Sequence, residues 1–221
     1  MYKINEIFSA IQGEGLDLGI PSTFIRFSGC DLNCKFCDTH HDPVNGNFTL
    51  SELFGLVKEL GNRSVIITGG EPTLHPLLPL LKLLKEDGIR IGVESNFYMP
   101  TPEGWEDFVD TWSLAPKAKV TLEVFPKWQA FGISVPDGTQ KAVKLLHPHF
   151  SRLEIEYFLE KFQGIDFNYG FTFYIMPVNQ DFTLHKTNNE NSLVMAKELA
   201  REFPDLDIRW GTQWHKTIGE K

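Results

Sequence analysis

The chain has 221 residues, of which 42% are hydrophobic and 23% charged, with a formal net charge of −8. This length predicts one domain over residues 1–221 with a substantial buried core. The acidic balance disfavours nucleic acid as a partner, because phosphate contacts need clustered Lys and Arg. No run approaches the roughly 20 apolar residues of a membrane span, and the N-terminus lacks the apolar core of a signal peptide. We therefore expect a soluble, cytoplasmic protein with no membrane partner.

In the first half of the chain, apolar spacing predicts a helix between two short strands. The strand candidates are the apolar runs Thr23–Phe27 and Ser64–Thr68. Between them, apolar residues recur over 50–60 at the spacing of one helix face. Thr49 opens a capping box at the start of this helix, and Gly61 follows its end.

The alternation of strands and helices continues to the C-terminus. Helices are predicted over 77–84, from Ser151 onward with a second capping box to Glu154, and over 188–203. Residues 115–139 show neither period and predict an irregular excursion. The remaining strands are expected at Ile89–Glu94, Thr111–Leu114, Lys141–Leu146, Phe171–Met176 and Asp207–Trp210.

This order of elements predicts an α/β fold with a parallel sheet and right-handed crossovers. About seven strands with only four clear helices indicate an incomplete (β/α) barrel, in which the chemistry lies at the C-terminal ends of the strands. Three polar or glycine-rich segments follow successive strands, at 30–37, 69–72 and 94–96. We expect them to meet on one rim, with a cluster-binding cysteine loop directly after the first strand.

All three cysteines of the chain fall within eight residues, as Cys30, Cys34 and Cys37 in a C-x3-C-x2-C spacing. An odd number excludes full pairing in disulfides, and clustered thiols in a reducing compartment favour metal binding or redox chemistry. Three thiolates can hold three irons of a [4Fe–4S] cluster and leave the fourth open for S-adenosylmethionine (SAM). A structural zinc site completed by His40 or His41 is the alternative.

The segment Gly69-Gly70-Glu71-Pro72 follows a predicted strand, where glycines let the backbone approach a ligand closely. Alone it reads as an ordinary turn between a strand and a helix. Together with the cysteine spacing it resembles the radical SAM superfamily. That resemblance implies that the turn meets the methionine amino group of SAM. Phe36, between the last two cysteines, suits packing beside the cluster or the adenine.

Further segments narrow the resemblance to the 7-carboxy-7-deazaguanine synthase family, from Ile4 to the C-terminus and more weakly across 97–170. They are Ile4–Gly15 with its Gln-Gly-Glu-Gly, Phe24–Cys30, Cys37-Asp38-Thr39 and Gln213-Trp-His-Lys216. The resemblance implies a radical lyase that converts 6-carboxy-5,6,7,8-tetrahydropterin to 7-carboxy-7-deazaguanine with loss of ammonia, as in 7-deazapurine (queuosine-type) biosynthesis. It also implies a [4Fe–4S] cluster, SAM and Mg²⁺ as cofactors, a flavodoxin or ferredoxin reductant, and a homodimer.

The resemblance assigns roles to individual residues. It implies cluster ligation by Cys30, Cys34 and Cys37, and Mg²⁺ binding by Thr39. It implies SAM contacts from Phe36, Cys37, Asp38, Gly70, Glu71, Ser95, Ala115 and Lys117. It implies substrate contacts from Ile11, Gln12, Gly13, Glu14, Arg26, Thr68, His215 and Lys221. The planar fork of the arginine suits a carboxylate or a pterin edge.

The chain departs from the family pattern at three places. Ala115 stands where Ser is usual before Pro-Lys, so any SAM contact there must come from the backbone. Phe97 follows Glu94-Ser95-Asn96 where glycine is common, and Met176 precedes Pro177 where Gln is common. These changes bear mainly on the outer contacts of SAM.

Two rival functions are open from the sequence. A glycyl-radical-enzyme activase shares the short chain and the cysteine spacing, but its substrate is a protein, and the Gln-Gly-Glu-Gly and Gln-x-His-Lys segments have no obvious purpose there. A non-catalytic iron–sulfur electron carrier normally gives its cluster four protein ligands, whereas this chain has three cysteines. Formation of a glycyl radical on a partner favours the activase, and failure to cleave SAM favours the carrier.

Overall fold

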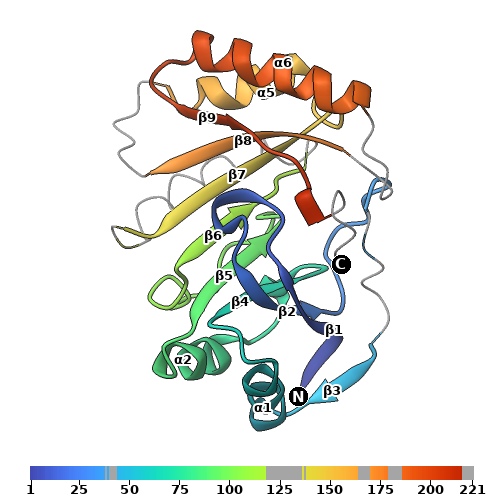
Figure 1. The fold of residues 1–221 in the computed structure, drawn as a ribbon, viewed down its shortest axis with the longest axis vertical. Coiled ribbons are helices and arrows are strands. Elements are labelled where there is room, and N and C mark those ends of the chain that lie inside the picture. Colours follow the sequence, from blue (N-terminus) through green and yellow to red (C-terminus); the bar gives the residue numbers. More distant parts are fainter. Residues whose placement is uncertain are drawn as a thin grey trace.

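A computed structural model describes residues 1–37, 39, 44–117, 136, 138–163, 170–178 and 186–215. Within these ranges the strands form one sheet in the order β3-β1-β2-β4-β5-β6-β7-β8-β9 (Figure 1). Every neighbouring pair from β2 to β9 is parallel, while β1 runs antiparallel to both β2 and β3. The sheet is open, with β3 and β9 at its edges, which confirms the predicted incomplete barrel.

The strand bounds agree closely with the apolar runs in the sequence. The strands are β1 Tyr2–Ile11, β2 Pro21–Phe27, β3 Gly46–Phe48, β4 Ser64–Gly69, β5 Arg90–Ser95, β6 Thr111–Leu114, β7 Gln140–His147, β8 Phe171–Pro177 and β9 Asp207–Trp210. All seven predicted strands are confirmed. The two that were not predicted, β1 and β3, are the antiparallel additions at one edge.

One prediction needs correction, because the cysteine loop does not follow the first strand of the chain. It follows β2, which is the first strand of the parallel series. β1 escaped the sequence analysis because its burial does not alternate along the strand and it carries polar Asn5, Glu6 and Ser9. β3 is only three residues long, too short for any period to show.

The helices cover the outer face of the sheet. They are α1 Leu50–Leu60, α2 Leu78–Glu86, α5 Arg152–Glu160 and α6 Lys186–Glu202, with short 3₁₀ turns η1 Gly15–Asp17 and η2 Pro72–Leu74. Both predicted capping boxes are present, at Thr49 and Ser151, and Gly61 ends α1 with a left-handed φ of 73°. In Figure 1, α5 and α6 lie over the β7–β9 end of the sheet, and α1 and α2 lie at the other end. No helix in the described part of the chain is long and apolar enough to cross a membrane.

Alternation along the strands separates the core from the inner face of the partial barrel. In β7, Val143 and Leu145 belong to the main apolar core beneath the helices. Ala142 belongs instead to a small apolar cluster with Leu16, Tyr174 and Met176. Since successive side chains point to opposite faces, Lys144 shares the inner face with Ala142. The interior of the barrel therefore carries polar groups as well as apolar ones.

The connection between β1 and β2 fills the barrel interior at the N-terminal ends of β5 and β6. Its turn η1 places buried Asp17 against the first residues of β5 and β6, where Arg90 donates two hydrogen bonds to the carboxylate, at 3.1 and 2.8 Å. The Thr111 hydroxyl lies 3.4 Å from the same oxygen. The N-terminal ends of these strands are thus closed, and the open space lies at their C-terminal ends.

Candidate active site

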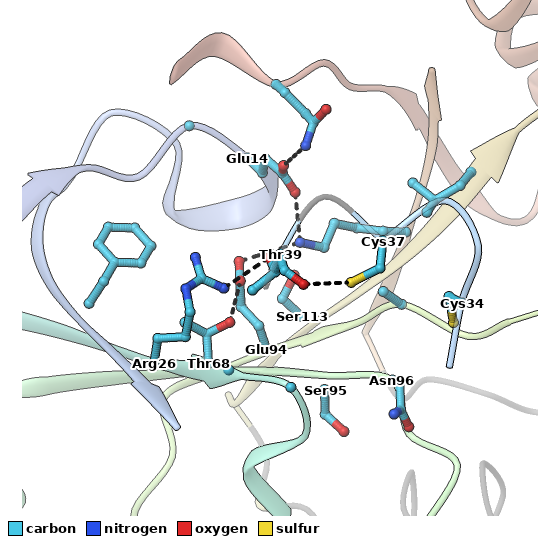
Figure 2. Close-up of a pocket in the computed structure, with 18 of the residues that line it drawn as sticks. Glu14, Arg26, Cys34, Cys37, Thr39, Thr68, Glu94, Ser95, Asn96 and Ser113 are labelled. Carbon is cyan, nitrogen blue, oxygen red and sulfur yellow. Dashed lines mark hydrogen bonds and ion pairs between the residues drawn. The ribbon is translucent and has the colours of Figure 1, made fainter. Parts of the chain in front are cut away.

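A cavity of about 520 Å³ opens at the C-terminal ends of the parallel strands. In Figure 2, Glu14, Arg26, Thr68 and Glu94 lie together at this cavity, and Cys34 and Cys37 of the cysteine loop lie nearby. It gathers most of the residues predicted for cluster, Mg²⁺, SAM and substrate: Ile11, Gln12, Gly13, Glu14, Arg26, Cys30, Cys34, Phe36, Cys37, Thr39, Thr68, Gly70, Ser95, Ala115, Lys117 and His215. Asp38 and Lys221 lie outside the described residues, as do His40 and His41.

All three cysteines line this cavity. Cys30 follows β2, and the Cys37 amide donates a hydrogen bond to the Cys34 carbonyl at 3.0 Å. Across the described ranges, no three His, Cys, Asp or Glu side chains are gathered closely enough to hold a single metal ion. A four-iron cluster takes each thiolate on a different iron, so its ligands need to surround a space rather than meet at a point. The donor set fits such a cluster.

The environment of Cys30 favours the neutral thiol in the absence of iron. Burial raises the pKa of this thiol to about 11, and the nearby carboxylates of Asp31 and Glu71 act in the same direction. Burial also raises the pKa of Cys34. Metal ligands of this type bind as thiolates, so loading of iron must displace protons from this loop.

The glycine turn after β4 packs directly against the cysteine loop. A Cβ added to Gly70 would collide with the carbonyl oxygen of Gly29 and lie 2.9 Å from the Cβ of Cys30. The Glu71 amide donates to the same Gly29 carbonyl at 2.9 Å. Only glycine therefore allows the two backbones to approach this closely at the rim of the cavity.

Glu71 is fully buried and does not line the cavity. Its carboxylate accepts hydrogen bonds from the Ser95 hydroxyl at 2.9 Å and the Asn96 amide at 2.8 Å. The Thr73 amide also donates to it, at 3.0 Å. Burial raises the pKa of Glu71 against the effect of these donors. The side chain fixes the turn after β4 to the turn after β5, and its contact with SAM stays a prediction.

The turn after β5 explains one departure from the family pattern. Phe97 has a left-handed φ of 56° and is buried, and its amide donates to the Ser95 hydroxyl oxygen at 2.9 Å. A left-handed backbone is the conformation that favours glycine. The turn therefore keeps the shape that a glycine would give it, with the phenylalanine ring added to the core.

A pair of packed rings, Phe36 and His149, lies at the cysteine loop. The Phe36 ring packs against the His149 ring with 3.8 Å between centroids, and the Lys117 ammonium lies 5.6 Å from the centre of the Phe36 ring. The Ala115 amide already donates to the Ser95 carbonyl at 2.8 Å. Any backbone contact from Ala115 to a ligand therefore falls to its carbonyl oxygen.

The opposite wall carries the residues predicted to contact substrate. Arg26 donates to the Thr39 hydroxyl at 3.2 Å and pairs with the Glu6 carboxylate at 3.3 Å. Thr68 donates to one oxygen of Glu94 at 3.1 Å. The first two contacts join β1, β2 and the cysteine loop, and the third joins β4 to β5. Figure 2 shows Arg26 beside Thr39, and Thr68 beside Glu94.

The C-terminal segment lies on the connection between β1 and β2. The Trp214 amide donates to the Gly13 carbonyl at 3.0 Å, and the Gln213 amide group donates to Glu14 at 2.8 Å. A Cβ on Gly13 would collide with the imidazole of His215 and lie 2.7 Å from its backbone nitrogen. The fold thus brings His215 beside residues more than 200 positions earlier in the chain.

The sequence analysis missed Lys144 and gave Glu94 no role, yet both line the cavity. The Lys144 ammonium lies 2.8 Å from Glu14 and 3.3 Å from Glu94. Burial alone would lower the pKa of Lys144, but the two carboxylates raise it. Burial alone would raise the pKa of Glu14, but Lys144, with His215 and Gln213, lowers it. The sequence held one signal for Lys144, because it is a lysine between apolar residues of a predicted strand.

Comparisons with known proteins show which family the chain is similar to. Residues 24–122 match the model of the radical SAM superfamily. The chain is 42% identical over 124 residues to the 7-carboxy-7-deazaguanine synthase of Bacteroides thetaiotaomicron, covering 56% of this chain and 65% of that one. It is 32% identical over 180 residues to the synthase of Burkholderia multivorans, covering 72% and 80%.

The extent of these matches differs between sequence and structure. The chain spans about half to two thirds of the length of the first curated relatives that it matches. The crystal structure of QueE from Escherichia coli superimposes with a TM-score of 0.69 at 21% identity, covering 96% of this chain and 93% of that one. At this identity the superposition supports the fold.

Proposed function

We propose that this chain, which belongs to the 7-carboxy-7-deazaguanine synthase family, converts 6-carboxy-5,6,7,8-tetrahydropterin to 7-carboxy-7-deazaguanine with loss of ammonia. The observation that carries the proposal is the composition of one cavity. It joins the three thiols of the C-x3-C-x2-C loop to the Gln12–Glu14 turn, Arg26 and His215, which mark the family in the sequence. A chemically different function of this cavity would give the Gln12–Glu14 turn, Arg26 and His215 no purpose.

Membership of the radical SAM superfamily implies a [4Fe–4S] cluster and SAM, which together supply a carbon-centred radical that abstracts hydrogen from the substrate. Cys30, Cys34 and Cys37 would hold the cluster. Gly70 brings backbone within reach of a ligand beside the cysteine loop, and Phe36 offers an aromatic face nearby. The task of these residues is to hold the reacting groups together and keep water away.

The substrate would occupy the wall formed by the residues from Ile11 to Glu14, Arg26, Thr68 and His215. The guanidinium of Arg26 is held by Glu6 and Thr39, so its fork is oriented before a ligand arrives. The proposal keeps Asp38 as a SAM contact and Lys221 as a substrate contact. It also keeps a flavodoxin or ferredoxin as reductant, a homodimer, and a cytoplasmic location.

Mg²⁺ bound by the Thr39 hydroxyl is part of the proposal, since a hydroxyl with substrate oxygens and water suits a hard octahedral ion. Thr39→Ala is expected to abolish the stimulation of product formation by added magnesium while leaving the magnesium-free rate in place. Thr39→Ser, which keeps the hydroxyl, is the matched control and should respond as the wild type does. Initial rates measured against magnesium concentration check this, and an unchanged response in Thr39→Ala removes the residue from the role.

The proposed function is tested by anaerobic reconstitution with iron and sulfide, followed by incubation with SAM, reductant, Mg²⁺ and the pterin. Mass spectrometry should detect 7-carboxy-7-deazaguanine only when cluster and SAM are both present. Formation of 5′-deoxyadenosine without change in the pterin would refute the substrate and favour the activase. Absence of both products from cluster-loaded protein would favour the electron carrier.

A further inference from the structure

A largely buried charge cluster joins three elements at the substrate wall. Lys144 on β7 pairs with Glu14 from the connection between β1 and β2, at 2.8 Å, and with Glu94 near the end of β5, at 3.3 Å. The side chains of Lys144, Glu14 and Glu94 are 8%, 14% and 24% exposed. Figure 2 labels the two glutamates, Glu14 and Glu94, at the cavity. All three line that cavity.

The charges in this cluster do not cancel. Two carboxylates and one ammonium leave a net charge of −1 in a largely buried place. Two buried carboxylates repel each other and cannot both stay ionised cheaply without a cation. Lys144 touches both carboxylates, so its removal would leave two negative charges without the cation that they share.

The cluster also fixes where the carboxylate oxygens point. The Oε1 atom of Glu94 accepts from Gln12 at 3.2 Å and from Lys144, and Oε2 accepts from Thr68 at 3.1 Å. In Glu14, Oε1 accepts from Gln213 and Oε2 from Lys144, both at 2.8 Å. A carboxylate has about four acceptor sites, so each retains capacity for another donor on its cavity side.

The proposed pterin substrate carries several N–H donors, which are the groups that ionised carboxylates bind best. From this geometry we infer that Lys144 is a positioning residue, which holds the carboxylates of Glu14 and Glu94 in place to accept hydrogen bonds from N–H groups of the substrate. The inference rests on the proposed function. It adds a specific task for a residue that does not itself need to touch the reacting atoms.

Other charged groups face this cluster from neighbouring elements. His215 of the C-terminal segment lowers the pKa of Glu14. Burial lowers the pKa of Lys117, which follows β6, and the charge of Lys144 acts in the same direction. Arg26 on β2 is paired with Glu6 on β1. All of these groups are unchanged in a Lys144 variant. A ratio of variant to wild-type affinity at each pH therefore isolates the effect of the lysine.

The sign of the pH dependence follows from burial. With Lys144 present, the pKa of Glu14 is lowered, so this carboxylate stays ionised throughout the neutral and alkaline range. In Lys144→Met the pKa of Glu14 rises, because its burial is no longer opposed by the lysine. Glu14 is then protonated to a larger extent at the low end of the pH range, and loses this proton as the pH rises. The variant should therefore bind substrate worst at low pH and improve toward high pH.

The test measures Kd for 6-carboxytetrahydropterin by anaerobic calorimetry on cluster-loaded protein with SAM, between pH 6 and 9. The Kd of Lys144→Met relative to wild type should be raised at least about 30-fold at pH 6 and should shrink about tenfold by pH 9. Lys144→Arg keeps the cation, so its ratio should not vary with pH. Should Lys144→Met fail to fold, Lys144→Gln, which is neutral but still donates a hydrogen bond, carries the same test.

A Lys144→Met ratio that stays near one, or that does not change with pH, would overturn the positioning role. So would the same pH-dependent loss in Lys144→Arg. Wild-type protein that neither binds nor converts the pterin would instead refute the proposed function, and the inference with it. The wild-type titration thus separates the two failures.

Discussion

Simultaneous replacement of Cys30, Cys34 and Cys37 by alanine is expected to remove all cluster iron and abolish both SAM cleavage and product formation. These are the only cysteines in the chain, so no thiol remains to take over a lost position. Each thiolate in such a cluster holds a separate iron, and the fourth iron must stay free for SAM. The expected effect is therefore complete loss of turnover.

Iron and sulfide analysis of the reconstituted protein gives the direct measurement, and 5′-deoxyadenosine gives the functional one. The control is the thermal unfolding of the iron-free proteins, which should differ little, because the three side chains lie at the cavity and are half-buried or exposed. A triple variant with full iron content and activity would contradict the assignment of this loop. If the variant loses iron and also unfolds, its loss of activity comes from the loss of the fold and not from the loss of the cluster alone.

The regular part of the fold followed from local signals in the sequence. The capping boxes at Thr49 and Ser151 set two helix starts, because each satisfies backbone donors that the first turn leaves open. The buried parallel strands appear as short apolar runs, since both of their faces are covered. β1 and β3 gave no such signal. Their place depends on pairing at the edge of a sheet that the rest of the chain builds.

The candidate site was predictable where a residue type has few other uses. Clustered cysteines and a glycine turn at a strand end restrict the chemistry even before the fold is known. Lys144 was not predictable in the same way, because a lysine in a strand is usually solvated. Its partner Glu14 is 130 residues away, so only the folded structure shows that the two meet.

Glu71 illustrates the opposite limit of a motif. Its place beside Gly70 predicts a SAM contact, which stays a prediction, while its carboxylate accepts hydrogen bonds from Ser95 and Asn96. A sequence motif indicates that a residue belongs to the site. It does not indicate whether the side chain contacts the ligand or stabilises the surrounding turns. In this turn, the glycine shapes the surface and the glutamate fastens it to the neighbouring turn.

Gly70→Ala is expected to separate the glycine turn from the cysteine loop, with loss of both stability and cluster binding. The new Cβ would collide with the carbonyl oxygen of Gly29, and the Cβ of Cys30 would lie at only 2.9 Å. Backbone on both sides cannot move away as a flexible side chain would. Inserting a methyl group into a well-packed place costs about 1–3 kcal/mol. Movement of Cys30 should also misplace a cluster ligand.

Denaturant unfolding of the iron-free protein measures the first effect, and iron content with the Kd for SAM measures the second. Gly55→Ala is the matched control, because Gly55 lies within α1 with nothing within 4 Å of an added Cβ. That change should raise stability by about 0.5–1 kcal/mol and leave iron binding unaltered, since alanine is the better helix former. Wild-type stability and iron content in Gly70→Ala would mean that the turn has room to move. The close contact between the two loops would then not be what places Cys30 at the cavity.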